Sequence, residues 1–405
     1  MPKKSSKLLI PQFALAHFSH HVCTGVLIPL LPLIREYFSL SYFQAGLLVS
    51  SFSISYGLGQ VPMAVIADIF SRRLTVIFGL IFVSLTGIGI SLTREFWQMV
   101  PFFIVMGIIG ATYHAPASSF ISQLVPSHKR GKALGFHTVG GSASFLLTPA
   151  MALYIAYLFQ SWRASFLILA LPALLVGTVL YFSTQETKSD VAESDERPEN
   201  SKKESDETEN ASEPGSLEIS WIQIIRALGI IAGLSMTVQI FSAGVRSYLP
   251  LFVVDHHGIS PELAGIVISL MAGSGIVGAP LGGMLSDRFG RKKIILLAVA
   301  LSGPLFFAVI RVPYGIPLLI ALVLYGLSMS VRMPSMESLI ADVVPVGRRT
   351  TVMGVYYFIG METAGIATPI IGRLIDAYGL DLIFTIIAAG LCAIAAIALL
   401  FRKQI

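Results

Sequence analysis

Long apolar stretches, separated by short polar segments, run through this sequence from residue 10 to residue 401. Each stretch is long enough to cross the ~30 Å of hydrocarbon in a bilayer. In hydrocarbon only helices and closed barrels satisfy every backbone hydrogen bond, and these stretches are too long and too evenly apolar for barrel strands. The sequence therefore predicts an all-α membrane protein with 12 transmembrane helices. The predicted spans are 10–34, 44–66, 74–93, 99–124, 133–158, 164–183, 226–254, 261–285, 294–312, 316–341, 351–376 and 381–401.

The few charged residues, 13% of the chain, are too scarce to cover a soluble domain of this size. Basic residues gather in alternate connections, whereas the connections between them carry mixed or acidic sets such as Arg94 and Glu95. By the positive-inside rule the basic connections and both termini are cytoplasmic. We therefore expect a multi-pass protein of the inner (cytoplasmic) membrane.

Residues 185–220 differ in composition from the rest of the chain. Between Glu186 and Glu218 there are 12 acidic and 4 basic residues and few apolar ones. Such a segment cannot bury enough apolar surface to fold, so we expect a disordered cytoplasmic linker. The predicted domains are an N-terminal bundle over 1–184, the linker over 185–220 and a C-terminal bundle over 221–405.

The two halves of the chain repeat one pattern. The segment around Asp68 resembles the segment around Asp287, and 287 − 68 is 219. The same offset relates Arg130 to Arg349. A constant offset over this distance indicates duplication, so we expect two pseudo-symmetric six-helix bundles with a binding site between them.

The repeated segment also indicates a family. Residues 282–293, GGMLSDRFGRKK, resemble the loop signature of the major facilitator superfamily, and a degraded copy carries Ile69 and Ser71 in place of the usual Arg and Gly. The resemblance covers the chain outside the linker. It implies the major facilitator fold, a monomer in which helices 1, 4, 7 and 10 line a central cavity. It further implies a cytoplasmic charge latch that steadies the outward-facing state. The expected latch residues are Asp68, Arg72, Asp287, Arg288 and Arg291.

A second resemblance points to a subgroup. The first span contains His17-Phe-Ser-His-His21 and the fourth contains Tyr113-His114-Ala115-Pro116, which resemble elements of fosmidomycin-resistance-type exporters. The sequence departs from that pattern because His21 stands where an acidic residue is expected and Ala115 separates His114 from Pro116. The resemblance implies proton-coupled antiport and efflux of a small compound.

Two arginines fall inside predicted spans. Arg246 ends a polar stripe on span 226–254, and Arg332 lies at mid-depth in span 316–341. Guanidinium groups facing one cavity suit a carboxylate, phosphonate or phosphate, which they can grip through two hydrogen bonds. The alternative is that each arginine pairs with an internal carboxylate, Glu337 or Glu362. The stripe on span 226–254 consists of Ser235, Gln239, Ser242 and Arg246, and we include Gln239 among the substrate-binding residues.

Other ionisable groups in the spans are candidates for proton coupling. Glu362 is central in span 351–376, where burial would favour its protonated form. Imidazoles titrate near neutral pH and can relay protons, or can bind a transition metal. No acidic or thiolate partners accompany the imidazoles in their spans, so we predict no dedicated metal site. The predicted coupling residues are Glu362, His17, His114 and His137, and His17, His21, His114, Tyr113 and Tyr56 are predicted to contact substrate.

The sequence lacks the motifs of other functional classes. It contains no G-x-x-x-x-G-K-[ST] phosphate loop, no H-E-x-x-H motif and no catalytic constellation. We therefore expect neither an enzyme nor a cofactor, and the basic loops, which topology explains, indicate no nucleic-acid partner. The predicted function is secondary active transport of a small anionic or amphipathic organic solute, coupled to protons. The alternatives are uptake of a monocarboxylate-like anion, transition-metal transport and solute sensing at the membrane.

Overall fold

The computed structural model describes residues 6–125, 127–184, 221–344 and 346–400, and the predicted linker over 185–220 lies outside these residues. All regular secondary structure in the described part is helical, as the sequence predicts. The helices are α1 (Ser6–Thr24), α2 (Leu27–Phe38), α3 (Tyr42–Ile69), α4 (Arg72–Ser91), α5 (Phe96–Gly110), α6 (His114–Leu124), α7 (Ser127–Leu158), α8 (Trp162–Ser183), α11 (Trp221–His257), α12 (Pro261–Phe289), α13 (Arg291–Arg311), α14 (Ile316–Val343), α15 (Val346–Tyr378) and α16 (Leu380–Leu400).

These helices form 12 candidate membrane spans in the described residues, which confirms the predicted count. Several helices continue past the apolar stretch that predicts them. For example, α11 runs from Trp221 to His257, beyond the predicted 226–254. Hydrogen bonds within a helix do not require an apolar side chain, so a helix can extend into the interfacial region on either side of the hydrocarbon.

Two spans that the sequence predicts as single helices are interrupted. The first is divided into α1 and α2 at Gly25 and Val26, and the fourth into α5 and α6 at Ala111, Thr112 and Tyr113. Proline accounts for both positions, because its ring clashes with the carbonyl four residues earlier. Pro29 is four residues after Gly25, and Pro116 is four residues after Thr112. The second break brings Tyr113 and His114 to the start of α6.

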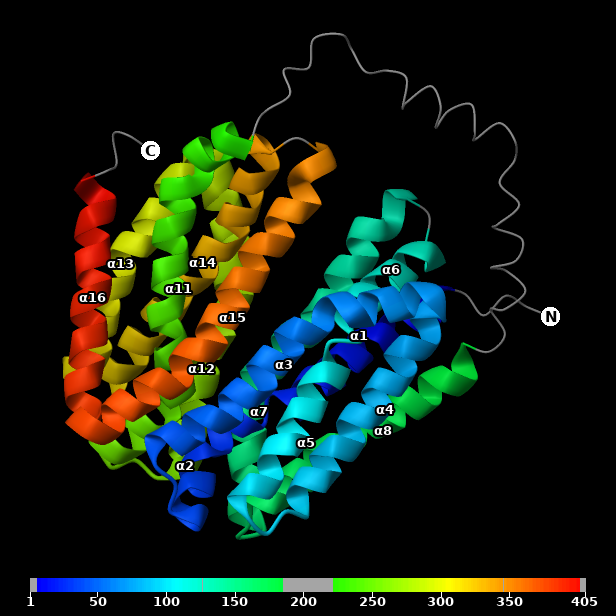
Figure 1. Ribbon diagram of the computed structural model, residues 1–405, viewed down its shortest axis with the longest axis horizontal. Helices are drawn as coiled ribbons and strands as arrows, with labels where there is room; N and C mark the ends of the chain where they lie inside the picture. The colour runs from blue at the N-terminus through cyan, green and yellow to red at the C-terminus, as the bar shows by residue number, and fades with distance from the viewer. Residues whose placement is uncertain (1–5, 126, 185–220, 345, 401–405) are drawn as a thin grey trace.

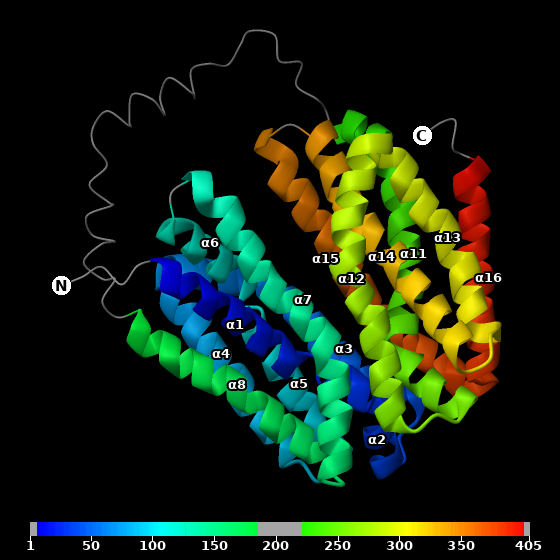
Figure 2. The same cartoon turned by 180° about the vertical axis from the view of Figure 1, so that it is seen from behind.

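The helices form two bundles that repeat each other. Helices α12, α13 and α15 begin 219 residues after α3, α4 and α7, respectively, at Pro261 against Tyr42, Arg291 against Arg72 and Val346 against Ser127. The predicted duplication therefore extends to the secondary structure. Between the bundles, α3 packs against α15 and α7 packs against α12. Figures 1 and 2 show the bundles meeting near α2 and separating toward the end where α1 begins and α16 ends.

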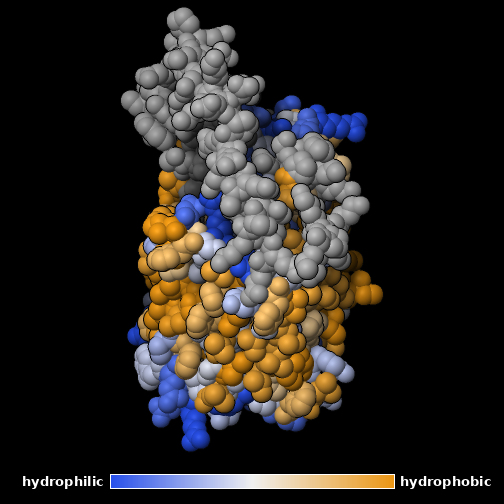
Figure 3. Space-filling model, turned by 90° about the vertical axis from the view of Figure 1, so that its right-hand side faces the viewer, coloured by the Kyte–Doolittle hydropathy of each residue, from blue (hydrophilic) through white to orange (hydrophobic). Residues whose placement is uncertain are grey.

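The outer surface of the helices is apolar around the middle of the molecule. Figure 3 shows a broad hydrophobic band with hydrophilic side chains gathered at both ends. Large apolar side chains that are more than half exposed include Val61, Leu175, Phe182 and Ile320. A belt of this kind is what a bilayer covers in a helical membrane protein.

Candidate functional site

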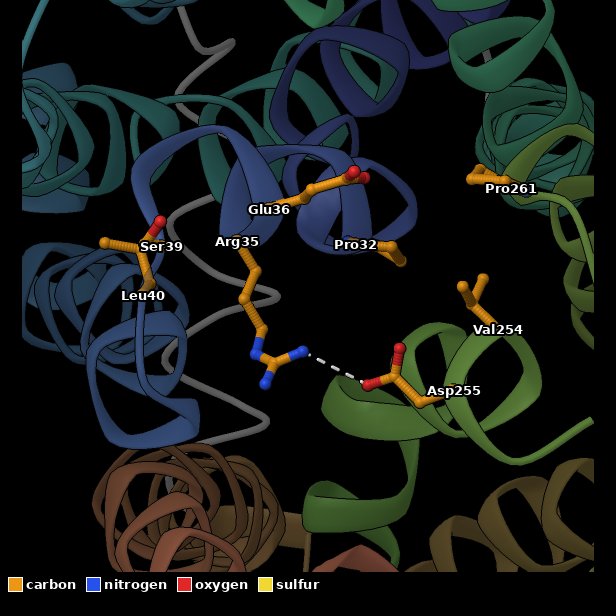
Figure 4. A pocket seen from close by; sticks show the side chains of 8 residues that line it. All are labelled: Pro32, Arg35, Glu36, Ser39, Leu40, Val254, Asp255 and Pro261. Carbon is orange, nitrogen blue, oxygen red and sulfur yellow. Dashed lines mark hydrogen bonds and ion pairs between the residues drawn. The ribbon is translucent and has the colours of Figure 1, made fainter. Parts of the chain in front are cut away.

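Hydrogen bonds and an ion pair close the bundles against each other at the α2 end. Arg35 of α2 pairs with Asp255 of α11 at 3.2 Å, across a pocket of about 380 Å³ that Figure 4 shows. The Tyr42 hydroxyl of α3 donates to the same carboxylate at 2.6 Å, and the Arg35 guanidinium lies 4.0 Å above the Tyr42 ring. Asp255 therefore holds two helices of the other bundle.

Two further contacts join the bundles at the α2 end, one at the first residues of α3 and one at the buried Tyr248. The Asp376 carboxylate of α15 accepts the backbone N–H groups of Tyr42 and Phe43, at 2.7 and 2.9 Å. The Tyr248 hydroxyl of α11 lies 3.0 Å from the Tyr42 carbonyl oxygen and 2.9 Å from the Thr368 carbonyl oxygen. We call Arg35, Tyr42, Tyr248, Asp255 and Asp376 the seal.

At the opposite end, where α1 begins, no hydrogen bond or ion pair between described residues joins the bundles. The bundles also separate toward this end (Figures 1 and 2). Among the described residues, the bundles are therefore joined at the α2 end and diverge toward the end where α1 begins and α16 ends, an asymmetry that alternating access requires of each of its two states.

Arg332 of α14 is fixed in the C-terminal bundle by Ser235 of α11. Its Nη1 donates to the Ser235 carbonyl oxygen at 2.8 Å and also to the Ser235 hydroxyl. That hydroxyl lies 3.0 Å from the hydroxyl of Tyr356 on α15, so three helices meet around the guanidinium. The side chain is only 7% exposed, and its Nε has no hydrogen-bond partner among the described residues. The anchored guanidinium thus retains an N–H donor, on Nε, that no described residue satisfies.

Arg246, on the same polar stripe of α11, is exposed although it lies within a candidate span. Its charge lies close enough to interact with Tyr325 and with Arg332. The Tyr325 hydroxyl donates to Ser242 at 3.3 Å, which places Ser242 in the same group. Two neighbouring guanidinium groups repel each other in the membrane interior, and an anion between them would relieve that repulsion.

The internal carboxylates do not pair with these arginines. No ion pair between described residues involves Arg246, Arg332 or Glu362. Glu362 of α15 instead reaches across to the N-terminal bundle, where its Oε1 lies against Gly57 of α3 and is buried without a hydrogen-bond partner in the described part of the chain. Gln239 points toward Gly360 of α15 and is half-buried.

A substitution at Gly57 tests whether the position of the Glu362 carboxyl group matters for coupling. A Cβ atom at Gly57 would meet Glu362 Oε1, which is the mobile end of a flexible side chain. We therefore expect Gly57→Ala to displace the carboxyl group at little cost in stability, shifting the melting temperature by no more than about 2 °C. Coupling of transport to a pH gradient, measured in proteoliposomes, should fall severalfold.

The matched control is Gly283→Ala, because a Cβ atom at Gly283 has no neighbour within 4 Å. This variant should retain both stability and coupling. Unchanged coupling in Gly57→Ala, with the protein correctly folded, would show that the position of the Glu362 carboxyl does not matter.

Histidines form a compact group in the N-terminal bundle. The ring centroids of His17 and His21 on α1 and of His114 on α6 lie 4.9, 5.2 and 5.0 Å apart, close to an equilateral triangle. One ring nitrogen from each lies within 4.8 Å of the others. The i,i+4 spacing on α1 and the break before α6 bring the three rings together. We call His17, His21 and His114 the histidine triad.

Two aromatic residues and a fourth histidine pack around the triad. The ring of His137 on α7 stacks on His17 at 4.2 Å, and Tyr113 stacks on His17 at 5.5 Å. His137 Nδ1 lies 3.0 Å from the Phe13 carbonyl oxygen. Tyr56 of α3 is buried and approaches His114 edge-on at 6.3 Å. The predicted wall residues of the N-terminal bundle are thus brought together in one group.

The triad and the Arg332 site occupy equivalent places in the two halves. Tyr113 and Arg332 are 219 residues apart, and so are His137 and Tyr356. Tyr113 donates its hydroxyl to the carbonyl oxygen of Phe13 on the first span, as Arg332 donates to a carbonyl oxygen of the equivalent helix α11. The duplicated framework therefore presents aromatic and imidazole groups in one half and guanidinium groups in the other.

Several site residues escape the sequence prediction. His20 is 1% exposed, stacks on Tyr113 at 4.6 Å, and neither ring nitrogen has a partner among the described residues. The prediction from the sequence includes Ser235 only as a member of the polar stripe on span 226–254, and it does not include Tyr356. The 219-residue offset, applied to His137, would have identified Tyr356. The seal carries no motif that the sequence could reveal.

The predicted latch residues lie within their own bundles here. Asp68 pairs with Arg72 at 2.7 Å. Arg291 pairs with Asp287 and, at 3.1 Å, with Asp342. The Arg288 guanidinium lies over the Phe289 ring at 5.3 Å. A latch between the bundles would form only when this end closes, so its role stays a prediction.

The sequence is similar to a family of known proteins over most of its length. A family model described as Major Facilitator Superfamily matches residues 13–283 and 228–404. The Hexuronate transporter of Bacillus subtilis (strain 168) is 23% identical over 384 residues, covering 91% of this chain and 88% of that protein. The Fosmidomycin resistance protein of Escherichia coli (strain K12) is 20% identical over 395 residues, covering 94% of this chain and 89% of that protein.

A solved structure has the same fold. It is that of a bacterial homolog of the human lysosomal transporter Spinster, in an inward-facing and occupied conformation. The TM-score is 0.81 at 18% identity, with 100% of this chain and 98% of that chain covered. Both resemblances predicted from the sequence are confirmed.

Proposed function

Since the chain belongs to the major facilitator superfamily, we propose that it carries a small organic anion across the inner membrane by alternating access, driven by protons. The observation that carries this proposal is the pair Arg246 and Arg332. Both lie in membrane spans, close enough to interact, and neither forms an ion pair with a described residue. A cation held in this way is costly unless it binds an anion in part of its cycle.

The compounds for which two relatives are named support an anionic solute. One is named for hexuronate, a sugar carboxylate, and the other for resistance to fosmidomycin, a phosphonate. Carboxylate and phosphonate share the oxygen geometry that a guanidinium binds through two hydrogen bonds. Opposite the arginines, Tyr113, Tyr56 and the histidine triad would contact the organic part of the solute.

Protons are proposed to drive transport through Glu362, with His17, His114 and His137 as further acceptors. Glu362 lies where the bundles touch, against Gly57, and its Oε1 has no partner among the described residues. An unpartnered carboxylate is unfavourable there, so this contact favours the protonated group. Loss of the proton from Glu362 would weaken the contact between Glu362 and Gly57. The two bundles could then separate at the level of this contact.

Export by antiport is the direction we propose, with both termini in the cytoplasm. We place the access to the arginines at the end where α1 begins and α16 ends, toward which the bundles separate (Figures 1 and 2). A proton entering from the opposite side would drive the return step. Uptake of the same anion in symport with protons is the second candidate, supported by the likeness to the hexuronate transporter.

Replacement of Glu362 tests the coupling. Glutamine resembles the protonated carboxyl group and cannot release a proton, so Glu362→Gln should retain solute exchange at equal pH on both sides. It should lose accumulation driven by a pH gradient, at least about tenfold. Glu262→Gln, at the start of α12, is the matched control and should behave as wild type. Undiminished proton-driven accumulation in Glu362→Gln would remove Glu362 from the coupling mechanism.

A further inference from the structure

The histidine triad has the arrangement of a metal site, although the sequence predicts none. His17, His21 and His114 each offer a ring nitrogen, and these nitrogens lie within 4.8 Å of one another. Tetrahedral coordination with Zn–N bonds of about 2.0 Å requires nitrogen–nitrogen separations of about 3.3 Å. Small rotations of the His21 and His114 rings, which are half-buried, would close that difference.

The hydrogen bonding of His17 independently indicates a ligand. Its Nδ1 lies 2.9 Å from the His137 carbonyl oxygen, and a carbonyl oxygen can only accept, so Nδ1 carries the proton. In the neutral ring Nε2 is then an acceptor with a free lone pair. This Nε2 is buried and has no partner among the described residues, and the residue is 7% exposed. Histidines that bind metals commonly donate their other N–H to a backbone carbonyl in this way.

Packing holds the His17 ring in this orientation. His137 stacks on one side at 4.2 Å. Gly141 of α7 lies so close that a Cβ atom there would be 2.6 Å from His17 Cε1 and 2.8 Å from Nε2. A ligand whose rotamer is fixed before binding loses less entropy when the metal arrives.

We propose that the histidine triad binds one divalent first-row transition-metal ion, such as Zn²⁺ or Co²⁺, through three imidazoles. No other His, Cys, Asp or Glu among the described residues joins the three nitrogens, so we expect the fourth ligand to come from outside the described residues. His21 and His114 are half-buried rather than buried, which leaves an approach for that ligand. His114 begins α6, and a helix N-terminus favours an anionic group nearby. We therefore expect water, hydroxide or an anionic oxygen in the fourth position.

Co²⁺ titration of the purified full-length chain tests this proposal, with an affinity tag that contains no histidine. Wild type should bind one Co²⁺ per chain, with the intense visible absorption of tetrahedral cobalt. His17→Asn, His21→Asn and His114→Asn should each weaken binding by about a hundredfold or more. His257→Asn, which changes a histidine outside the triad, is the control and should bind as wild type.

X-ray absorption of the Zn²⁺-loaded wild type provides a measurement that needs no variant. Three imidazole nitrogens at about 2.0 Å from the metal are expected. One imidazole or none, or equal Co²⁺ affinity in wild type and in folded triad variants, would overturn the proposal. Neither measurement depends on transport, so the metal site can fail while the proposed anion transport stands, and the reverse. A bound metal ion would occupy His17 and His114, which leaves Glu362 and His137 as the proton acceptors in the metal-bound protein.

Discussion

Replacement of Arg332 with alanine is expected to abolish transport of small organic anions. The buried guanidinium is anchored to Ser235 by one nitrogen, and its Nε has no hydrogen-bond partner among the described residues. Removing one partner of a buried charge pair typically costs about 3 kcal/mol, which corresponds to a loss of about a hundredfold. Arg332→Lys should restore only part of the activity, because an ammonium group cannot make the two parallel hydrogen bonds. Initial rates of anion flux in proteoliposomes measure both variants.

The control for this experiment is Arg311→Ala. Arg311 lies at the end of α13, is exposed, and stacks on Phe307 at 5.3 Å. Its loss also removes one positive charge, so it reports any general effect of charge on flux, and it should leave transport unchanged. Full anion transport by Arg332→Ala would remove the anion-binding role from this site.

The second large effect is expected from two glycines that pack against residues of the seal. A Cβ atom at Gly46 would lie 2.2 Å from the Tyr248 hydroxyl and 3.0 Å from the Pro369 Cα. A Cβ atom at Gly372 would lie 2.5 Å from the Tyr42 carbonyl oxygen. Backbone atoms cannot give way as side-chain ends can, and overpacking costs about 1–3 kcal/mol at each position. The double variant Gly46→Ala, Gly372→Ala should therefore shift the equilibrium toward states open at the α2 end.

Spin-label distances across the α2 end measure this shift. Tyr37 of α2 and Leu263 of α12 are exposed positions on different bundles, suitable for labelling. The double variant should populate a longer distance at least tenfold more than wild type, whereas Gly283→Ala should not. An unchanged distance distribution would show that the close contacts at Gly46 and Gly372 do not hold the bundles together.

The spans and the duplication could be predicted because they depend on local composition and on one constant offset. Apolar length indicates a span whatever it packs against, and the offset between Asp68 and Asp287 recurs in the starts of the helices. The i,i+4 spacing of His17 and His21 likewise predicts a shared face. These properties need no knowledge of how distant helices meet.

The seal and the partner of Arg332 could not be predicted, because they depend on contacts between helices far apart in sequence. Arg35 and Asp255 are separated by 220 residues and stand in the sequence as ordinary charges near span ends. Glu362 was an equally plausible partner for Arg332, yet it turns to the opposite bundle and lies against Gly57. The rotation of a helix about its axis decides which neighbouring helix a polar side chain faces. The periodicity of the sequence does not determine this rotation.

In the proposed mechanism, arginines hold an organic anion between the two bundles, and a proton gradient drives its movement. Purified protein in liposomes, supplied with labelled carboxylates and phosphonates under imposed pH and voltage gradients, tests this most directly. We predict that a pH gradient drives accumulation of at least one anion, that internal pH changes as the anion moves, and that uncharged analogues are not carried. Anion flux that ignores the pH gradient, or equal flux of an uncharged analogue, would contradict the account.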